Sequence, residues 1–211
     1  MLEKKLLNIA LLLSFITITY NLVEGGISIF FGLKDGALAL LGFGIDSFVE
    51  ILSGLGITHM VLRMRASEVK SRDKFERFAL KITGSSFYIL SVGLIIGTIL
   101  NLIKNVKPDT TIPGLFISLI SIATMKLLMD SKLKIGKKIN SDAIISDAKC
   151  TKTCLILSII LFFSSLFYLF LKIGYIDILG TLGIAYYSFL EGKESFEKAT
   201  SQNLKCKCEN D

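Results

Sequence analysis

Long apolar blocks separated by short polar segments run through the whole chain of 211 residues. A helix needs about 20 mainly apolar residues to cross a bilayer. Six blocks approach or exceed that length, at 6–31, 37–62, 78–103, 112–129, 143–171 and 176–190. The pattern predicts an all-α polytopic membrane protein in which residues 1–195 form one bundle of six transmembrane helices. Residues 196–211 form a short polar tail.

The basic residues alternate between the two sides of this predicted bundle. Few of them follow the first, third and fifth blocks, whereas many follow the second and fourth blocks or lie near the two termini. The segment after the fourth block, for example, holds Lys132, Lys134, Lys137 and Lys138. Lysine and arginine collect on the cytoplasmic side of membrane proteins, so both termini are predicted to be cytoplasmic. This orientation explains the net charge of +6 without a nucleic-acid partner.

Acidic residues inside the apolar blocks carry the functional signal. Each costs about 2.5–3.5 kcal/mol at the middle of a membrane helix and usually marks an ion path or a paired site. Asp46 and Glu50 are four residues apart in the second block, so they share one helix face. A divalent cation between them would remove their repulsion. The alternative is a salt bridge, but the second block itself holds no lysine or arginine.

The fifth block offers thiols beside a carboxylate. Asp147, Cys150 and Cys154 fall within an arc of about 60° on a helix. Thiolates together with carboxylates suit zinc or a similar metal, although buried cysteine can also serve packing alone. If the second and fifth spans touch, Asp46, Glu50, Cys150 and Cys154 form one metal site near the middle of the membrane. Asp147 would then assist metal access or ligation.

Glu24 is a further buried acid, in the first block. Asn21 and Ser28 lie on its helix face. Three roles fit this group, and the residues do not separate them. Glu24 and Asn21 could supply a third helix of the metal site, a proton-coupling carboxyl, or a hydrogen bond between helices.

Two smaller features allow a functional and a plain interpretation. Cys206 and Cys208 in the tail suit metal capture, but a disordered end without function fits them equally well. Gly93 and Gly97 form a GxxxG pair in the third block. Such pairs let helices approach closely, and packing within the chain is favoured here over the seam of a homodimer.

The spans that hold these residues resemble those of the cation diffusion facilitator family. GLKDGALALLGFGIDSFVEILSG resembles the family's second span, with its two metal-binding positions at Asp46 and Glu50. KINSDAIISDAKCTKTCLILSIIL resembles the fifth span, with the corresponding pair at Cys150 and Cys154 and a further acid at Asp147. YIDILGTLGIAYYSFLEGKESF resembles the sixth span. The resemblance implies six helices, a divalent-cation site between spans two and five, and proton-coupled export from the cytoplasm.

The chain departs from the family pattern in two respects. The family histidines are absent, and two thiols make the site softer, which favours zinc or cadmium over magnesium or manganese. The family also usually carries a cytoplasmic metal-binding domain after the sixth span, where this sequence has about twenty mainly polar residues. Dimerisation and metal sensing through such a domain are therefore not expected.

Together these features predict a transporter rather than an enzyme. Its substrate is a divalent metal ion, with zinc preferred and cadmium, cobalt or iron as alternatives, and protons are the counter-ion. The protein is predicted to lie in the lipid bilayer of a prokaryotic plasma membrane. The sequence does not decide whether it forms a homodimer. One competing interpretation is a membrane thiol oxidoreductase that uses Cys150 and Cys154, although redox pairs favour a Cys-x-x-Cys spacing. The other is a proton-coupled exporter of small organic cations.

Overall fold

The computed structural model describes residues 2–65, 74–104, 112–139, 142–173 and 175–200. Helices account for nearly all of them, and no strand occurs in these ranges. The helices are α1 (Leu2–Asp35), α2 (Leu38–Arg65), α3 (Lys74–Lys104), α4 (Ile112–Lys138), α5 (Asp142–Leu171) and α6 (Tyr175–Thr200). Each predicted apolar block corresponds to one helix, so the prediction of a six-helix bundle is confirmed.

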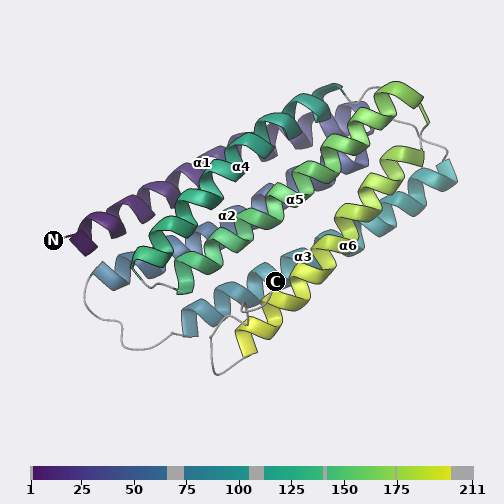
Figure 1. Cartoon of the computed structure of the whole chain (residues 1–211). Coiled ribbons are helices and arrows are strands. Elements are labelled where there is room, and N and C mark those ends of the chain that lie inside the picture. The colour runs from purple at the N-terminus through teal and green to yellow at the C-terminus, as the bar shows by residue number, and fades with distance from the viewer. Residues whose placement is uncertain (1, 66–73, 105–111, 140–141, 174, 201–211) are drawn as a thin grey trace.

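In the described part of the chain, five helices are long and apolar enough to cross a membrane. Their spans are Lys5–Asp35, Leu38–Gly56, Lys81–Ile103, Ile112–Lys138 and Asp147–Leu171. The remaining helix, α6, carries charged residues throughout its second half. It nevertheless runs along the same bundle, packed lengthwise against α3 (Figure 1).

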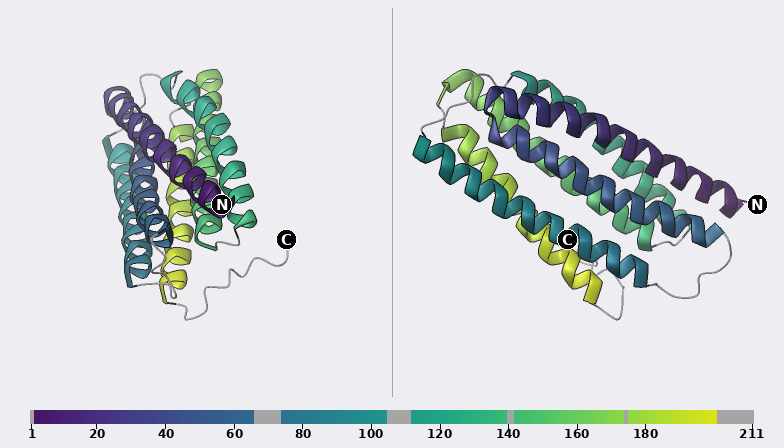
Figure 2. Two further views of the ribbon diagram at one scale, coloured as in Figure 1. Left: turned by 90° about the vertical axis from the view of Figure 1, so that its left-hand side faces the viewer. Right: turned by 180° about the vertical axis from the view of Figure 1, so that it is seen from behind.

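The helices pair along the bundle, and α2 lies at its centre. The closest pairs are α1 with α2, α3 with α6, and α4 with α5. Beyond its contact with α1, α2 also packs against α3, α5 and α6. All six helices run along the long direction of the bundle, as the views in Figure 2 show. The start of α1 and the end of α6 lie at the same end (Figure 1), as an even number of crossings requires.

The interior of the bundle is unusually polar, and its surface is apolar. Large side chains such as Phe15, Phe30 and Ile89 are more than half exposed, which suits contact with lipid rather than water. The buried face of α1, in contrast, is polar over four turns at alternating spacings of three and four residues. It consists of Ser14, Thr17, Asn21, Glu24 and Ser28. Small polar residues let membrane helices pack closely and bond to one another.

A tight turn joins α1 to α2 and presses the two helices together. Gly36 has a φ of 66°, which glycine adopts at little cost, and the Ala37 amide donates to the Gly32 carbonyl at 3.0 Å, closing the end of α1. A Cβ at Gly32 would lie 2.7 Å from the backbone nitrogen of Leu41. At Gly44 it would lie 2.9 Å from the backbone nitrogen of Ile29. These glycines therefore allow the backbones of α1 and α2 to touch.

Substituting Gly32 by Ala should destabilise the bundle by about 1–3 kcal/mol, the usual cost of overpacking. The added methyl group meets backbone atoms of α2, which cannot rotate away as a side chain can. The measurement is thermal unfolding of the purified protein in detergent. Gly26→Ala is the matched control on the same helix, because a Cβ there would meet no atom of the described residues within 4 Å. Equal melting temperatures for the two variants would contradict the close contact.

The first turn of α6 is hydrogen-bonded to the start of α2. The Asp177 carboxylate accepts the backbone amides of Leu38 at 3.1 Å and Ala39 at 3.4 Å. A carboxylate at a helix N-terminus satisfies unpaired amides and complements the helix dipole. This contact positions α2, which carries two of the predicted metal ligands.

The predicted glycine pair of α3 behaves differently at its two positions. A Cβ at Gly97 would lie 3.4 Å from the Leu38 side chain of α2, so this glycine packs within the chain, as predicted. A Cβ at Gly93 would have no atom within 4 Å among the described residues. Only one member of the pair therefore serves the contact between α3 and α2.

Candidate metal centre

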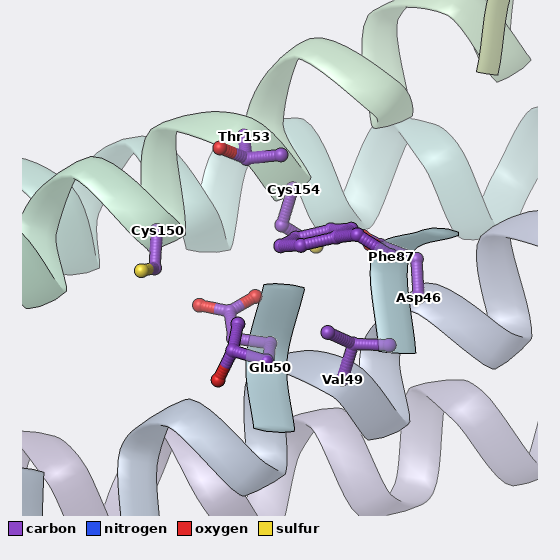
Figure 3. Close-up of a pocket in the computed structure, with 8 residues that line it drawn as sticks. Asp46, Val49, Glu50, Phe87, Cys150, Thr153 and Cys154 are labelled. Atoms are coloured by element: carbon purple, nitrogen blue, oxygen red, sulfur yellow. The ribbon is translucent and has the colours of Figure 1, made fainter. Parts of the chain in front are cut away.

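One small cavity brings together four of the predicted ligands. Asp46 and Glu50 of α2 line it together with Cys150 and Cys154 of α5 (Figure 3). Its volume is about 10 Å³, which is room for roughly one water-sized sphere. The remaining lining residues are Val49, Thr83, Phe87 and Thr153. The contact between the second and fifth spans, on which the predicted site depended, is present.

The acidic groups of this cavity are withdrawn from solvent. Asp46 is 2% exposed, Glu50 is 5% exposed and Cys154 is 1% exposed, whereas Cys150 is half-buried. Both side-chain oxygens of Glu50 are buried and have no hydrogen-bond partner in the described structure. An unpaired buried carboxylate is costly, so a cation in the cavity would supply what Glu50 lacks.

The four side chains surround the cavity without closing on a common point. Figure 3 shows the cysteines on α5 and the carboxylates on the facing α2, with Phe87 of α3 beside them. Among the residues described, no three His, Cys, Asp or Glu side chains lie close enough to hold a metal ion as they stand. Ligation of an ion would therefore require these side chains to draw together.

Asp147 lies apart from the other predicted ligands. It does not line the cavity; its carboxylate forms an ion pair with the Lys132 ammonium of α4, with Nζ 3.0 Å from Oδ2. Lys132 also donates to the Thr151 hydroxyl at 2.9 Å. Both members of the ion pair are almost completely buried, with side chains 2% and 3% exposed.

The burial of Lys132 corrects the sequence analysis, which assigned it to a polar segment outside the membrane. α4 continues to Lys138, and Lys132 continues its buried face at spacings of three and four residues. That face consists of Gly114, Ser118, Ser121, Met125, Leu128, Lys132 and Ile135. The spacing was available in the sequence, but the surrounding lysines hid it. Thr83 and Phe87 carried no signal, because α3 holds no acidic residue or thiol near them.

Glu24 lies between α1 and α2 rather than on the cavity. Its carboxylate accepts the Tyr20 hydroxyl at 2.8 Å and the Ser47 hydroxyl at 3.3 Å. Asn21 donates to the Thr17 carbonyl at 2.9 Å, while its side-chain oxygen is buried without a partner in the described structure. Ser47 follows the cavity residue Asp46 in the chain, and its hydrogen bond joins Glu24 to α2. Cys206 and Cys208 lie outside the described residues.

Residues 14–202 match the family described as the cation efflux transmembrane domain, which confirms the predicted resemblance to this family. No curated protein matches the chain. The matching domain is the transmembrane domain of the cation diffusion facilitators, whose members are transporters of divalent metal cations rather than enzymes. With its membrane-spanning helices, this chain is an integral membrane protein that belongs to the cation diffusion facilitator family of metal cation transporters.

Proposed function

We propose that the protein exports a soft divalent cation, zinc or cadmium, from the cytoplasm of a prokaryotic cell in exchange for protons. Asp46, Glu50, Cys150 and Cys154 are its ligands in this proposal. The observation that carries it is the small cavity lined by these two carboxylates and two thiols. Thiolate ligands favour zinc and cadmium over magnesium or manganese.

The dimensions of the cavity favour a metal ion over an organic cation. A volume of about 10 Å³ accommodates an object of roughly the size of one water molecule. A desolvated metal ion fits such a space once the ligands close around it. A small organic cation would need a cavity many times larger.

Exchange for protons follows from the chemistry of the ligands. Carboxylates and thiols bind a metal only after they lose their protons. Protons therefore compete with the metal for the cavity, and metal binding weakens as the pH falls. A transporter that presents this cavity alternately to each side of the membrane would carry metal outward and return with protons. The α2–α5 contact is where such a rearrangement would open and close the site.

The test is zinc uptake into proteoliposomes that contain the purified protein. An acidic lumen should drive saturable uptake, because protons leave as zinc enters, and collapse of the pH gradient should slow it. Cadmium should compete with zinc, whereas magnesium should not. Absence of uptake for zinc, cadmium, cobalt and iron alike would reject metal transport through this cavity.

Glu24 is proposed as a proton-coupling carboxyl beside the site. Glu24→Gln should leave zinc uptake down its own gradient intact and remove most of the stimulation by the pH gradient. Tyr20→Phe is the matched control, because it removes one hydrogen bond to Glu24 and keeps the carboxyl. Wild-type coupling in Glu24→Gln would leave Glu24 as a hydrogen bond between helices. Loss of zinc binding would make it a ligand.

A further inference from the structure

Buried polar contacts join α4 to α5 on both sides of the cysteine pair. The Lys132 ammonium of α4 lies 3.0 Å from the Asp147 carboxylate and donates to the Thr151 hydroxyl at 2.9 Å. Farther along the two helices, the hydroxyls of Ser121 and Ser158 are hydrogen-bonded at 2.8 Å. All five side chains are buried. The two cavity cysteines lie between the first and the last of these contacts along α5.

The contact of Lys132 holds the turn of α5 that contains Cys150. Thr151 accepts the Lys132 ammonium and donates to the Asp147 carbonyl at 3.3 Å. Asp147 and Thr151 are about one helical turn apart, with Cys150 between them in the chain. Hydrogen bonds to an ionised group are roughly twice as strong as neutral ones. This turn therefore cannot slide or rotate against α4 without breaking a strong contact.

Cys150 depends more on this support than Cys154 does. Cys154 is 1% exposed and belongs to the main apolar core, so its neighbours fix its position. Its carbonyl also accepts the Ser158 hydroxyl at 2.7 Å. Cys150 is only half-buried. The place of its sulfur is therefore set mainly by the backbone turn that Lys132 holds against α4.

We propose that Lys132 and Thr151 are positioning residues for Cys150: their hydrogen bond fixes the turn of α5 that presents this thiol to the metal cavity. The inference rests on the proposed metal transport, because it takes Cys150 as a ligand. Residues that orient a metal ligand typically contribute about 10–100-fold to metal affinity. A contact that only packs α4 against α5 would affect stability and leave metal binding by sulfur unchanged.

The experiment titrates the detergent-purified full chain with cadmium and follows the sulfur-to-cadmium charge-transfer absorption in the ultraviolet, which reports ligation by thiolate. Thr151→Val keeps the shape of the side chain and removes its hydroxyl, while Lys132 keeps its ion pair with Asp147. This variant should bind cadmium about tenfold more weakly and show a weaker band at saturation. Thr151→Ser keeps the hydroxyl and should match the wild type.

The effect of Thr151 should disappear when the thiol that it positions is absent. In a Cys150→Ser background, Thr151→Val should therefore cause no further loss of cadmium affinity, because coupled residues do not act additively. An equal further loss in that background would show that Thr151 acts elsewhere, and it would overturn the positioning of Cys150.

A second variant decides the question if Thr151→Val does not fold. Lys132→Met with Asp147→Leu replaces the buried ion pair by apolar side chains, a change that is often neutral for stability or stabilising. It should keep the melting temperature and lose about tenfold in cadmium affinity. Lys126→Met is the matched control, because it makes the same change on α4 where the lysine side chain is 56% exposed. Its cadmium affinity should equal that of the wild type.

Weaker binding and a weaker band in Thr151→Val, with normal behaviour of Thr151→Ser, support the positioning role. Unchanged affinity and an unchanged band, with only a lower melting temperature, overturn it and leave a structural contact between α4 and α5. Failure of the wild type to bind cadmium or zinc rejects the proposed function and this inference together. That result is distinct from a wild type that binds metal and variants that bind it equally well.

Discussion

Asp46→Asn is expected to reduce zinc uptake in proteoliposomes by about a hundredfold or more. Asp46 is 2% exposed and lines the cavity with Glu50 and both cysteines. Asparagine has the same shape but lacks the charge that a divalent cation would need there. Removing one partner from a buried charge pair costs about 3–5 kcal/mol, which corresponds to a hundredfold or more in affinity.

Although Asp46→Asn should lower zinc uptake, it should not lower the stability of the metal-free protein. Without a metal, Asp46 and Glu50 are two acids on one face of a buried helix, and each charge is costly there. Asp46→Asn removes one of them, so the melting temperature of the metal-free variant should equal or exceed that of the wild type. A loss of uptake together with retained stability distinguishes a ligand from a residue that merely holds the fold.

Asp130→Asn is the matched control for this experiment. It makes the same chemical change on α4, where Asp130 pairs with Lys126 at 3.2 Å and both side chains are well exposed. Exposed pairs contribute little to stability, and Asp130 does not line the cavity. Uptake by Asp130→Asn should therefore match the wild type. Normal uptake by Asp46→Asn as well would remove Asp46 from the site.

The six-helix architecture was readable from the sequence because the bilayer sets the length of each apolar block. The ends of the helices were harder to predict from the sequence. The predicted fourth block stops at residue 129, yet α4 continues to Lys138, since a helix can extend past the apolar core wherever a neighbouring helix covers it. That extension carries Lys132 into the interior, against α5. The rule that places lysines at the cytoplasmic surface does not predict a lysine that is buried because it pairs with a buried carboxylate.

The site was predictable to the extent that it lies on single helices. The four-residue spacing of Asp46 and Glu50 identifies one face of α2, and that of Cys150 and Cys154 identifies one face of α5. Periodicity cannot say which helices touch, so the meeting of these two faces at one cavity required the structure. The same limit applies to Asp147. It shares an arc with the cysteines, but its carboxylate turns to a partner on α4 that the spacing within α5 cannot reveal.

The thiols should decide which metal the protein carries. Cys150→Ser with Cys154→Ser retains the approximate size of both side chains and replaces soft sulfur by a hydroxyl that stays protonated at neutral pH. Uptake of cadmium and zinc should fall about a hundredfold, because soft thiolate ligands provide much of the affinity for these ions. The measurement is uptake of cadmium, zinc and manganese by the same proteoliposomes. Thr153→Ser, a change in the same cavity that leaves both thiols, should behave as the wild type.

The converse variant replaces the soft thiol ligands of the cavity by hard carboxylate ligands. Cys150→Asp with Cys154→Asp offers four carboxylates, which suit manganese better than cadmium, so the ratio of manganese to cadmium uptake should rise about a hundredfold over the wild type. Unchanged cadmium uptake in the serine variant would make the thiols incidental and return the organic-cation exporter to consideration. A wild type that moves no metal, but loses thiol–disulfide exchange in the serine variant, would instead be an oxidoreductase. Metal-dependent protection of both cysteines from alkylation argues against that outcome, because a thiol that ligates a metal cannot attack a disulfide at the same time.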